Sequence, residues 1–161
     1  MTVESIHLLY PDFRRIEMKS IRLKEDIIPN LQGLVKSCDS VGWHHYTREP
    51  DKLKCAFSHS LKVIAAWDGE QLVGLVRAVG DGCTIVYIQD ILVSPSYQRQ
   101  GIGSWLLAYL LDIYENVRQK VLMTDNEPDR ISFYTKNGFV PIQRYSGVSF
   151  VNYTFDGEQG K

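Results

Sequence analysis

The stretch VSPSYQRQGIGSW, from Val93 to Trp105, joins an apolar run to an amphipathic helix through a polar segment that contains two glycines. The apolar run before it, CTIVYIQDILV, predicts a buried strand. After it, apolar side chains recur at the spacing of one helix face: Ile102, Trp105, Leu106, Tyr109, Ile113 and Val117. Glycines between a strand and a helix indicate that some group comes close to the backbone there.

Three phosphate-binding devices have glycines at such a junction. A P-loop requires a lysine after its second glycine, and this stretch contains no lysine. A dinucleotide-binding fingerprint beginning at Gly101 has Leu106 where the third glycine belongs. The third device fits: Gln98, Gly101 and Gly103 lead into a helix, so that backbone N–H groups from 98 to 104 face one anion. A glycine-rich turn without a ligand is the alternative that the loop alone leaves open.

The rest of the chain predicts a mixed α/β fold in one domain. Three apolar runs separated by tight turns at 68–69 and 80–82 predict an antiparallel meander. The long helix then crosses over, which should place the strand 120–124 parallel to the last meander strand. The other expected elements are a strand within 15–23, helices over Glu25–Cys38, Asp51–Ser60 and 128–136, an aromatic loop over 40–50, and strands at 139–145 and 147–155.

Composition excludes several classes of protein. The formal net charge of -1 gives no electrostatic reason to expect nucleic acid or an anionic membrane as partner. The N-terminus lacks the pattern of a signal peptide, and no stretch is apolar enough to span a bilayer, so we expect a cytoplasmic protein. The three cysteines are scattered, without a CxxC pair or a histidine at ligand spacing, and predict reduced thiols and no metal site.

Two motifs carry a resemblance to a known family. LVSPSYQRQGIGSWLL resembles the acetyl-CoA loop of the GCN5-related N-acetyltransferases (GNAT), whose signature is Gln or Arg, two residues, Gly, one residue, then Gly or Ala. FYTKNGF, Phe133 to Phe139, resembles the second signature of that family, FYxxxGF. The resemblance extends from about Ile16 to Phe155 and implies a single domain over 1–161, with 1–15 as an N-terminal extension.

The resemblance also implies the fold, a central mixed and mostly antiparallel sheet whose parallel fourth and fifth strands splay apart. A narrower likeness, to small amine acetyltransferases such as the plant serotonin N-acetyltransferases, is carried by VGW, GLVRAVGDG and DILVSPSYQ. Members of the family often form dimers, so a homodimer is one expectation for this chain.

The implied co-substrate is acetyl-CoA. In the family, the strand equivalent to the one ending at Val93 carries a bulge, and the pantetheine arm inserts beside it as a surrogate strand. A backbone N–H at Leu92 or Val93 then becomes the expected oxyanion donor. Many members have an asparagine seven residues before the motif tyrosine; Glu127 stands there, with Asn126 beside it. The expected cofactor-binding residues are Ile91, Leu92, Val93, Gln98, Arg99, Gln100, Gly101, Ile102, Gly103, Ser104, Asn126 and Tyr134.

Tyr134 and Asp90 are the candidate catalytic residues. A phenol with a pKa of ~10 is protonated at neutral pH and is able to give its proton to a departing thiolate. A packed aromatic is the alternative for Tyr134. Asp90 interrupts an apolar strand, where an acid is costly unless it is paired or faces a cleft, so it is either the general base or a buried structural carboxylate. His44 and His45 are alternative bases.

These observations together predict an N-acetyltransferase that transfers an acetyl group directly to a primary amine within a ternary complex. The motifs contain no cysteine to carry an acyl intermediate. Trp43, His44 and Tyr46, with Tyr145, Phe150 and Tyr153 as further candidates, suit a small aromatic amine through stacking and cation–π contacts. The alternatives are a protein N-terminus, lysine or polyamine acceptor, a non-catalytic acyl-CoA-binding module, and a dinucleotide-binding oxidoreductase.

Overall fold

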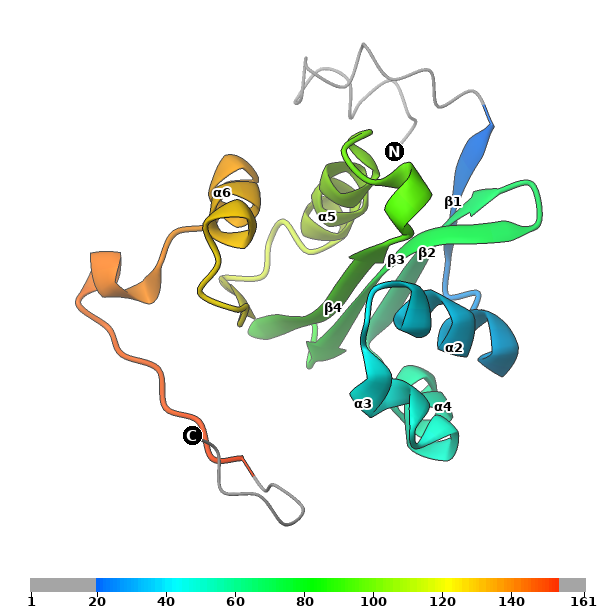
Figure 1. Cartoon of the computed structure of the whole chain (residues 1–161). Coiled ribbons are helices and arrows are strands. Elements are labelled where there is room, and N and C mark those ends of the chain that lie inside the picture. Colours follow the sequence, from blue (N-terminus) through cyan, green and yellow to red (C-terminus); the bar gives the residue numbers. More distant parts are fainter. Residues whose placement is uncertain (1–19, 154–161) are drawn as a thin grey trace. The chain divides into compact units, whose positions relative to one another are not determined.

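The computed structural model of the chain describes residues 20–153 (Figure 1), so the predicted N-terminal extension over 1–15 lies outside the described residues. The described residues belong to two compact units, one reaching to Asp125 and the other starting at Asn126. The organisation of 1–161 as a single domain stays a prediction.

The first unit is built on a five-stranded mixed sheet. Its strands lie side by side in chain order: β1 (Ile21–Glu25), β2 (Lys62–Asp68), β3 (Gln71–Gly80), β4 (Ile85–Val93) and β5 (Gln119–Leu122). The first three junctions are antiparallel, and β5 pairs with β4 in parallel. The predicted meander and the parallel return after the long helix are therefore both confirmed.

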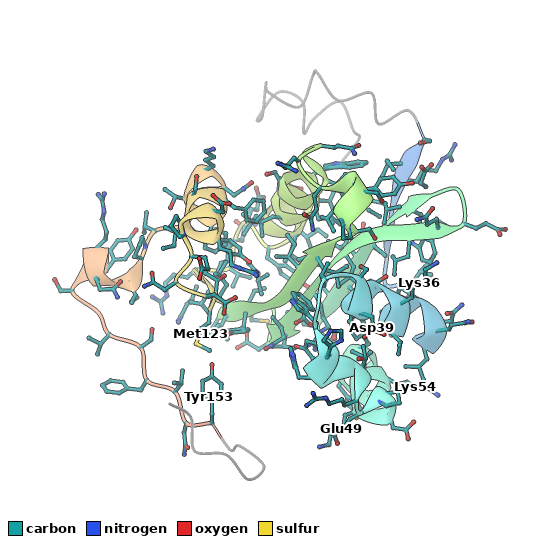
Figure 2. The ribbon with its side chains drawn as sticks, in the orientation of Figure 1. Lys36, Asp39, Glu49, Lys54, Met123 and Tyr153 are labelled. Atoms are coloured by element: carbon teal, nitrogen blue, oxygen red, sulfur yellow. The ribbon has the colours of Figure 1, made fainter. Side chains whose placement is uncertain are left out.

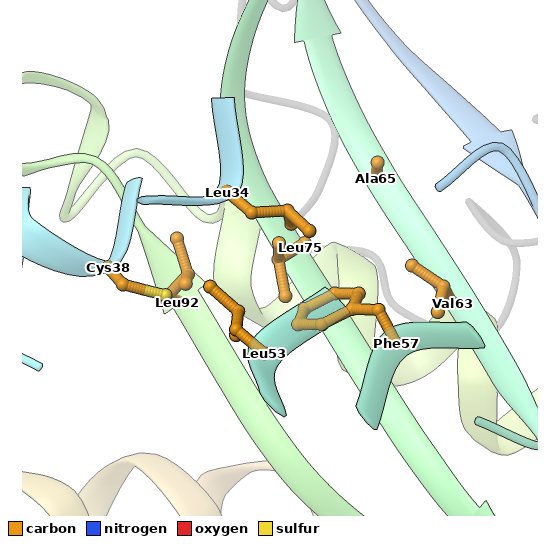
Figure 3. Close-up of a cluster of buried hydrophobic side chains, with 8 residues drawn as sticks. All are labelled: Leu34, Cys38, Leu53, Phe57, Val63, Ala65, Leu75 and Leu92. Atoms are coloured by element: carbon orange, nitrogen blue, oxygen red, sulfur yellow. The ribbon is translucent and has the colours of Figure 1, made fainter. Parts of the chain in front are cut away.

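Three helices cover one face of this sheet: α2 (Leu31–Ser40), α3 (His44–Thr47) and α4 (Pro50–Ser58). Figure 3 shows the cluster that holds them, formed by Leu34, Cys38, Leu53, Phe57, Val63, Ala65, Leu75 and Leu92. Its members come from α2, α4 and the inner strands of the sheet. Each is at most 4 % exposed. Burial of this apolar surface is the main favourable term that fixes α2 and α4 on the sheet.

The helix α5 (Ile102–Ile113) packs on the opposite face of the sheet. Gly74 of β3 marks the closest approach, because a Cβ there would meet Leu92 O at 3.1 Å and Leu106 Cδ1 at 3.2 Å. Ile102 and Leu106 are fully buried against the sheet. The first turn of α5 is thus fixed beside the C-terminal end of β4.

Two predicted elements near the N-terminus need correction. The helix expected over Glu25–Cys38 begins only at Leu31, and Ile27 and Ile28 are exposed ahead of it. Pro29 disfavours helical backbone in the residue before it, and the side chain of Asn30 caps the helix by accepting from Gly33 N–H at 2.8 Å. The aromatic loop expected over 40–50 contains the short helix α3.

The second unit contains α6 (Pro128–Lys136), with the bounds expected from the sequence. The strands predicted at 139–145 and 147–155 are wrong within the described residues: 142–145 form a 3-10 helix, and 147–153 have no regular structure. Pro141 precedes this 3-10 helix, and Ser146, with a φ of 56°, ends it in the left-handed region. Apolar alternation alone does not make a strand without a neighbouring strand to pair with.

Candidate functional site

A bulge interrupts β4 next to the end of its pairing with β5. Arg77 of β3 pairs with Asp90, but the next residue, Ala78, pairs with Ile88, so Gln89 is an extra residue on β4. Among the described residues, β5 pairs with β4 only as far as Ile88. Beyond that point β4 has an open edge, as the resemblance implies for the splayed strands.

The ladder with β3 determines which backbone groups face this open edge. Ser94 N–H donates to Val73 O at 2.8 Å, and residues of an antiparallel strand alternate between facing the partner and facing away. Leu92, two residues before Ser94, therefore directs its backbone groups toward β3. Ile91 and Val93 direct theirs toward the open edge. Of the two expected oxyanion donors, only the N–H of Val93 faces away from β3.

Three side-chain hydrogen bonds hold the loop between β4 and α5. The hydroxyl of Tyr97 donates to Asp68 Oδ2 at 2.9 Å, which joins the loop to the β2–β3 turn and raises the pKa of that phenol. Gln98 Nε2 donates to Val93 O at 2.9 Å, and Gln100 Nε2 donates to Ser96 O at 3.0 Å. These bonds tie the loop to the end of β2, to the end of β4 and to itself.

The backbone of this loop turns twice through the left-handed region, at Arg99 with a φ of 59° and at Gly101 with a φ of 86°. Such conformations in a loop can direct successive N–H groups into one concavity that binds an anion. Gln98 is not one of these donors, because its N–H bonds Pro95 O. Of the two glycines in the motif, only Gly101 has a positive φ. Gly103 lies inside α5 without a positive φ, and its contribution is the absence of a Cβ.

The N-terminus of α5 adds further N–H groups to this loop. Gly101 is the N-cap, and no side chain caps the helix. The first N–H groups of a helix have no partner within it and lie at the positive end of its dipole. Ile102, Gly103 and Ser104 are the first three residues of the helix. This end of the unit therefore suits a diphosphate without a lysine.

Asp90 lies in a buried network on the sheet face that α2, α3 and α4 cover. Its Oδ2 accepts from Arg77 Nε at 2.5 Å, and its Oδ1 accepts from the hydroxyl of Tyr46 at 2.7 Å. Arg77 and Asp90 are each 5 % exposed. Burial, reinforced by the charge of Asp90, raises the pKa of Tyr46 to about 12 and that of Cys38 to about 11. Because each carboxylate oxygen already has a donor, this geometry favours the structural alternative for Asp90.

Sequence reasoning did not single out Arg77 or Tyr97. The signal for Arg77 was available, because LVGLVRAV is otherwise apolar, just as VYIQDILV is around Asp90. Two opposite charges on neighbouring apolar strands indicate a pair. Nothing local to Tyr97 indicates its hydrogen bond to Asp68, which depends on the tertiary structure.

The expected acceptor-binding residues Trp43, His44 and Tyr46 lie together at α3. The ring centroids of Trp43 and Tyr46 are 5.9 Å apart, and those of His45 and Tyr46 are 4.3 Å apart. His44 is exposed and its Nδ1 lies 3.2 Å from Oδ1 of Asp39, which is labelled on α2 in Figure 2. Trp43 and Tyr46 are both half-buried against the core cluster, and His45 is exposed beside them.

Tyr134 and Asn126 belong to the second unit. Tyr134 is half-buried on α6 between Phe133 and Phe139, with ring centroids 5.1 and 6.0 Å away, both edge-on. Gly138 has a φ of 87° just after the helix, and Phe139 N–H returns to Tyr134 O at 3.0 Å. The FYTKNGF motif thus forms the last turn of α6 and its C-terminal cap, and Tyr134 lies within that turn. Tyr145, Phe150 and Tyr153 of this unit are strongly exposed.

Comparison with known families decides the identity of this architecture. The family model described as "Acetyltransferase (GNAT) family" matches residues 28–139, which include the loop and both motifs. The chain belongs to the GNAT family. It is therefore an acetyltransferase, as the two sequence motifs predicted, and its mixed sheet is the GNAT fold.

Two related proteins are also named as acetyltransferases. The GNAT chain is 33% identical over 141 residues to the uncharacterized N-acetyltransferase ycf52 of Porphyra purpurea, covering 85% of this chain and 80% of the relative. It is 31% identical to a protein of Glycine max named histone acetyltransferase TAP1, covering 68% of this chain and 50% of that relative.

Solved structures agree with the fold. A GNAT family acetyltransferase from Streptococcus pneumoniae matches with a TM-score of 0.75 and 35% identity, over 84% of this chain and 99% of the other. AAC(6')-Iy in complex with a bisubstrate analogue of CoA matches with a TM-score of 0.64 and 16% identity, over 84% of this chain and 99% of the other, which shows the fold alone.

Within residues 20–153, no helix combines the length and apolar character needed to cross a membrane. In the same part of the chain, no three His, Cys, Asp or Glu side chains are grouped so that they could hold a metal ion.

Proposed function

We propose that this GNAT protein uses acetyl-CoA as acetyl donor and a primary amine as acceptor, by direct transfer in a ternary complex. The observation that carries the proposal is the junction of β4 and α5. There, the open edge beyond Ile88 is followed by the loop that turns through the left-handed region at Arg99 and Gly101 and leads into the start of α5. An extended pantetheine arm needs the first feature and a diphosphate needs the second.

The residues of the loop fit this ligand. When bound, acetyl-CoA supplies an acetyl thioester. The backbone of Ile91 binds the arm as a neighbouring strand would, and the Val93 N–H stabilises the oxyanion, while Val93 O already accepts from Gln98 Nε2. Backbone N–H groups from Arg99 to Ser104 hold the diphosphate, and Gly103 keeps a side chain out of its way.

We assign the general acid to Tyr134. Its hydroxyl gives a proton to the departing thiolate, whose conjugate acid has a pKa of ~8.5. The contribution is modest, ~10- to ~100-fold in rate, because such a thiolate is already a fair leaving group. Asn126 is proposed as a further cofactor contact.

The acceptor that we propose is a small aromatic amine, bound by Trp43, His44 and Tyr46. The support is the clustering of these rings at α3, beside the buried network of β4. The test is a kcat/KM comparison of tryptamine and serotonin with spermidine and a lysine peptide. Faster turnover of spermidine or the peptide would reject the aromatic acceptor and leave the donor assignment intact.

A selective effect of Trp43 is the second expectation for the acceptor. Trp43→Ala should raise KM for tryptamine through the loss of stacking, with little effect on KM for spermidine. A change that is equal for all acceptors would point instead to a packing defect, since Trp43 also contacts the core cluster.

The test of the donor site is calorimetric binding of acetyl-CoA. Gly101→Ala should raise Kd about tenfold or more, or by about 1.4 kcal/mol, because a Cβ disfavours the φ of 86°. Gly42→Ala is the matched control, since Gly42 has a φ of 79° and lies outside the loop. If the folded Gly101 variant binds acetyl-CoA as tightly as the control, the loop does not hold the diphosphate.

Two alternatives remain as outcomes of these measurements. Binding of acetyl-CoA without thiol release for any amine would identify a non-catalytic acyl-CoA-binding module. Preference for the lysine peptide would match the name of the Glycine max relative, histone acetyltransferase TAP1. A cytoplasmic location and a homodimer stay predictions, and another relative is named as chloroplastic.

A further inference from the structure

The buried ion pair Arg77–Asp90 lies at the position where the β3–β4 register changes. Arg77 and Asp90 are the last cross-strand pair before the extra residue Gln89. Both side chains point to the face covered by α2, α3 and α4, where Leu75 and Leu92 also lie. The extra residue Gln89 therefore lies directly next to the buried pair of Arg77 and Asp90.

Every charged group of this pair has further partners. Arg77 NH1 donates to Ala56 O of α4 at 3.4 Å, and its guanidinium lies 5.2 Å from the ring centre of Phe57. Tyr46 of α3 donates to the second oxygen of Asp90. A buried ion pair is tolerated when its remaining polar groups are satisfied, and removal of one partner leaves an uncompensated charge. Two strands, β3 and β4, and two helices, α3 and α4, thus all contribute contacts to the pair of Arg77 and Asp90.

This arrangement exists in only one of the two registers that β4 could adopt. Without the bulge, the register in which Ala78 pairs with Ile88 would continue toward the C-terminal end of β4. Arg77 would then pair with Gln89 instead of Asp90. A slip of one residue turns every side chain to the other face of the sheet. Asp90 would then be opposite Val76, on the apolar face that packs against α5, where an unpaired carboxylate is strongly disfavoured.

The same slip would reverse the backbone groups. Residues of β3 that bond β4, such as Val73, would then meet Ile91 and Val93, so Leu92 would face the open edge instead. The register therefore determines whether Val93 is available to a ligand.

We propose that Arg77 and Asp90, supported by Tyr46, are positioning residues whose ion pair fixes the β4 bulge and so directs the backbone of Ile91 and Val93 to the open edge. The ligand consequence rests on the proposed function, because the groups so directed are those assigned to the pantetheine arm. Asp90 acts on the reaction through the backbone and is not the general base.

The first test measures the register without any ligand. In the wild-type protein, the amide of Leu92 should exchange slowly with deuterium and that of Val93 faster. In the double variant Arg77→Met with Asp90→Leu, which can pack as apolar residues of similar size, the order should reverse or the difference should vanish. An unchanged order in a folded double variant would overturn the proposal.

The second test separates the two halves of coenzyme A. Asp90→Asn keeps the shape and the contact to Tyr46 but removes the charge. It should weaken acetyl-CoA about tenfold and leave the affinity for 3′-phosphoadenosine 5′-diphosphate, which has no pantetheine arm, unchanged. Lys62→Met on β2 is the matched control. It removes the ion pairs of Lys62 with Asp26 (2.7 Å) and Glu25 (3.3 Å) and should change neither affinity.

The pH dependence of kcat separates a positioning residue from a base. Asp90→Asn should leave the pH profile unshifted, and Asp90→Glu should restore part of the acetyl-CoA affinity. Loss of the acidic limb of the profile in Asp90→Asn would make Asp90 the base and overturn the proposal. If wild-type protein binds neither acetyl-CoA nor the nucleotide, the proposed function fails, while the exchange of the Leu92 and Val93 amides still decides the register.

Discussion

Gly74→Ala should destabilise the protein, although alanine is the better residue in most strands. Replacing a strand glycine ordinarily gains about 0.5–1 kcal/mol of stability, because glycine loses more backbone entropy on folding. Here the added Cβ would lie 3.1 Å from Leu92 O and 3.2 Å from Leu106 Cδ1. Overpacking of this kind typically costs about 1–3 kcal/mol. The net loss is then between about 0 and 2.5 kcal/mol.

Urea denaturation followed by circular dichroism measures this change, with Gly33→Ala as control. Gly33 lies inside α2, and a Cβ there would meet only side-chain atoms, the capping oxygen of Asn30 at 3.3 Å and Pro29 Cβ at 4.0 Å, so a small shift of the cap is set against the helix propensity gained with alanine. Acetyl-CoA affinity should fall in Gly74→Ala, because α5 is displaced from the end of β4. A Gly74→Ala protein that is more stable than wild type and binds normally would refute the close contact between sheet and helix.

Three other measurements test separate parts of the structure. Tyr134→Phe should lower kcat by ~10- to ~100-fold with little change in acetyl-CoA affinity, and an unchanged kcat with chemistry rate-limiting would remove Tyr134 from the mechanism. Hydrogen bonds from Thr84, Ile85 and Cys83 lower the pKa of Asp81 well below 3.8. Its stabilising effect should therefore be complete above about pH 4 and be lost as the pH falls through the lower folded value, and Asp81→Ala should flatten this acid limb in denaturant titrations. Native protein should expose two thiols to Ellman's reagent, Cys55 and Cys83, and unfolding should add Cys38, whose burial raises its pKa to about 11; three fast thiols in the native state would contradict the packing of α2.

The sequence predicts the local elements of the first unit well because their signals are local. The tight turns, the parallel return and the start of α5 follow from turn residues and apolar spacing, and all are present. The helix face expected to reach Val117 is shorter, because α5 ends at Ile113. The start of α2 was misjudged because Ile27 and Ile28 continue the apolar pattern ahead of Pro29. The strands at 139–145 and 147–155 were misjudged because strand formation depends on a pairing partner that apolar alternation does not reveal.

The same distinction between local and tertiary signals applies to the candidate site. The motif identifies the loop, since glycine spacing reflects backbone conformation, and Gly101 has the positive φ expected of it. The register of β4 was not visible, because Gln89 is an extra residue only relative to β3. Likewise, Asp90 was recognised as unusual in its strand, but its role depends on Arg77 and Tyr46, which are distant in sequence.

The hydrogen bond from Gln98 to Val93 O gives the first position of the loop motif a chemical definition. That side chain must carry an N–H donor long enough to reach back five residues to a strand carbonyl, and in this chain it serves as a brace between strand and loop. Glutamine and arginine both carry such a donor, which accounts for their interchange in the signature. Glutamate has the same length but places a negative charge against the carbonyl oxygen, and methionine offers no donor at all. The first position of the motif therefore requires a side chain that is long enough to reach this carbonyl and that donates a hydrogen bond to it.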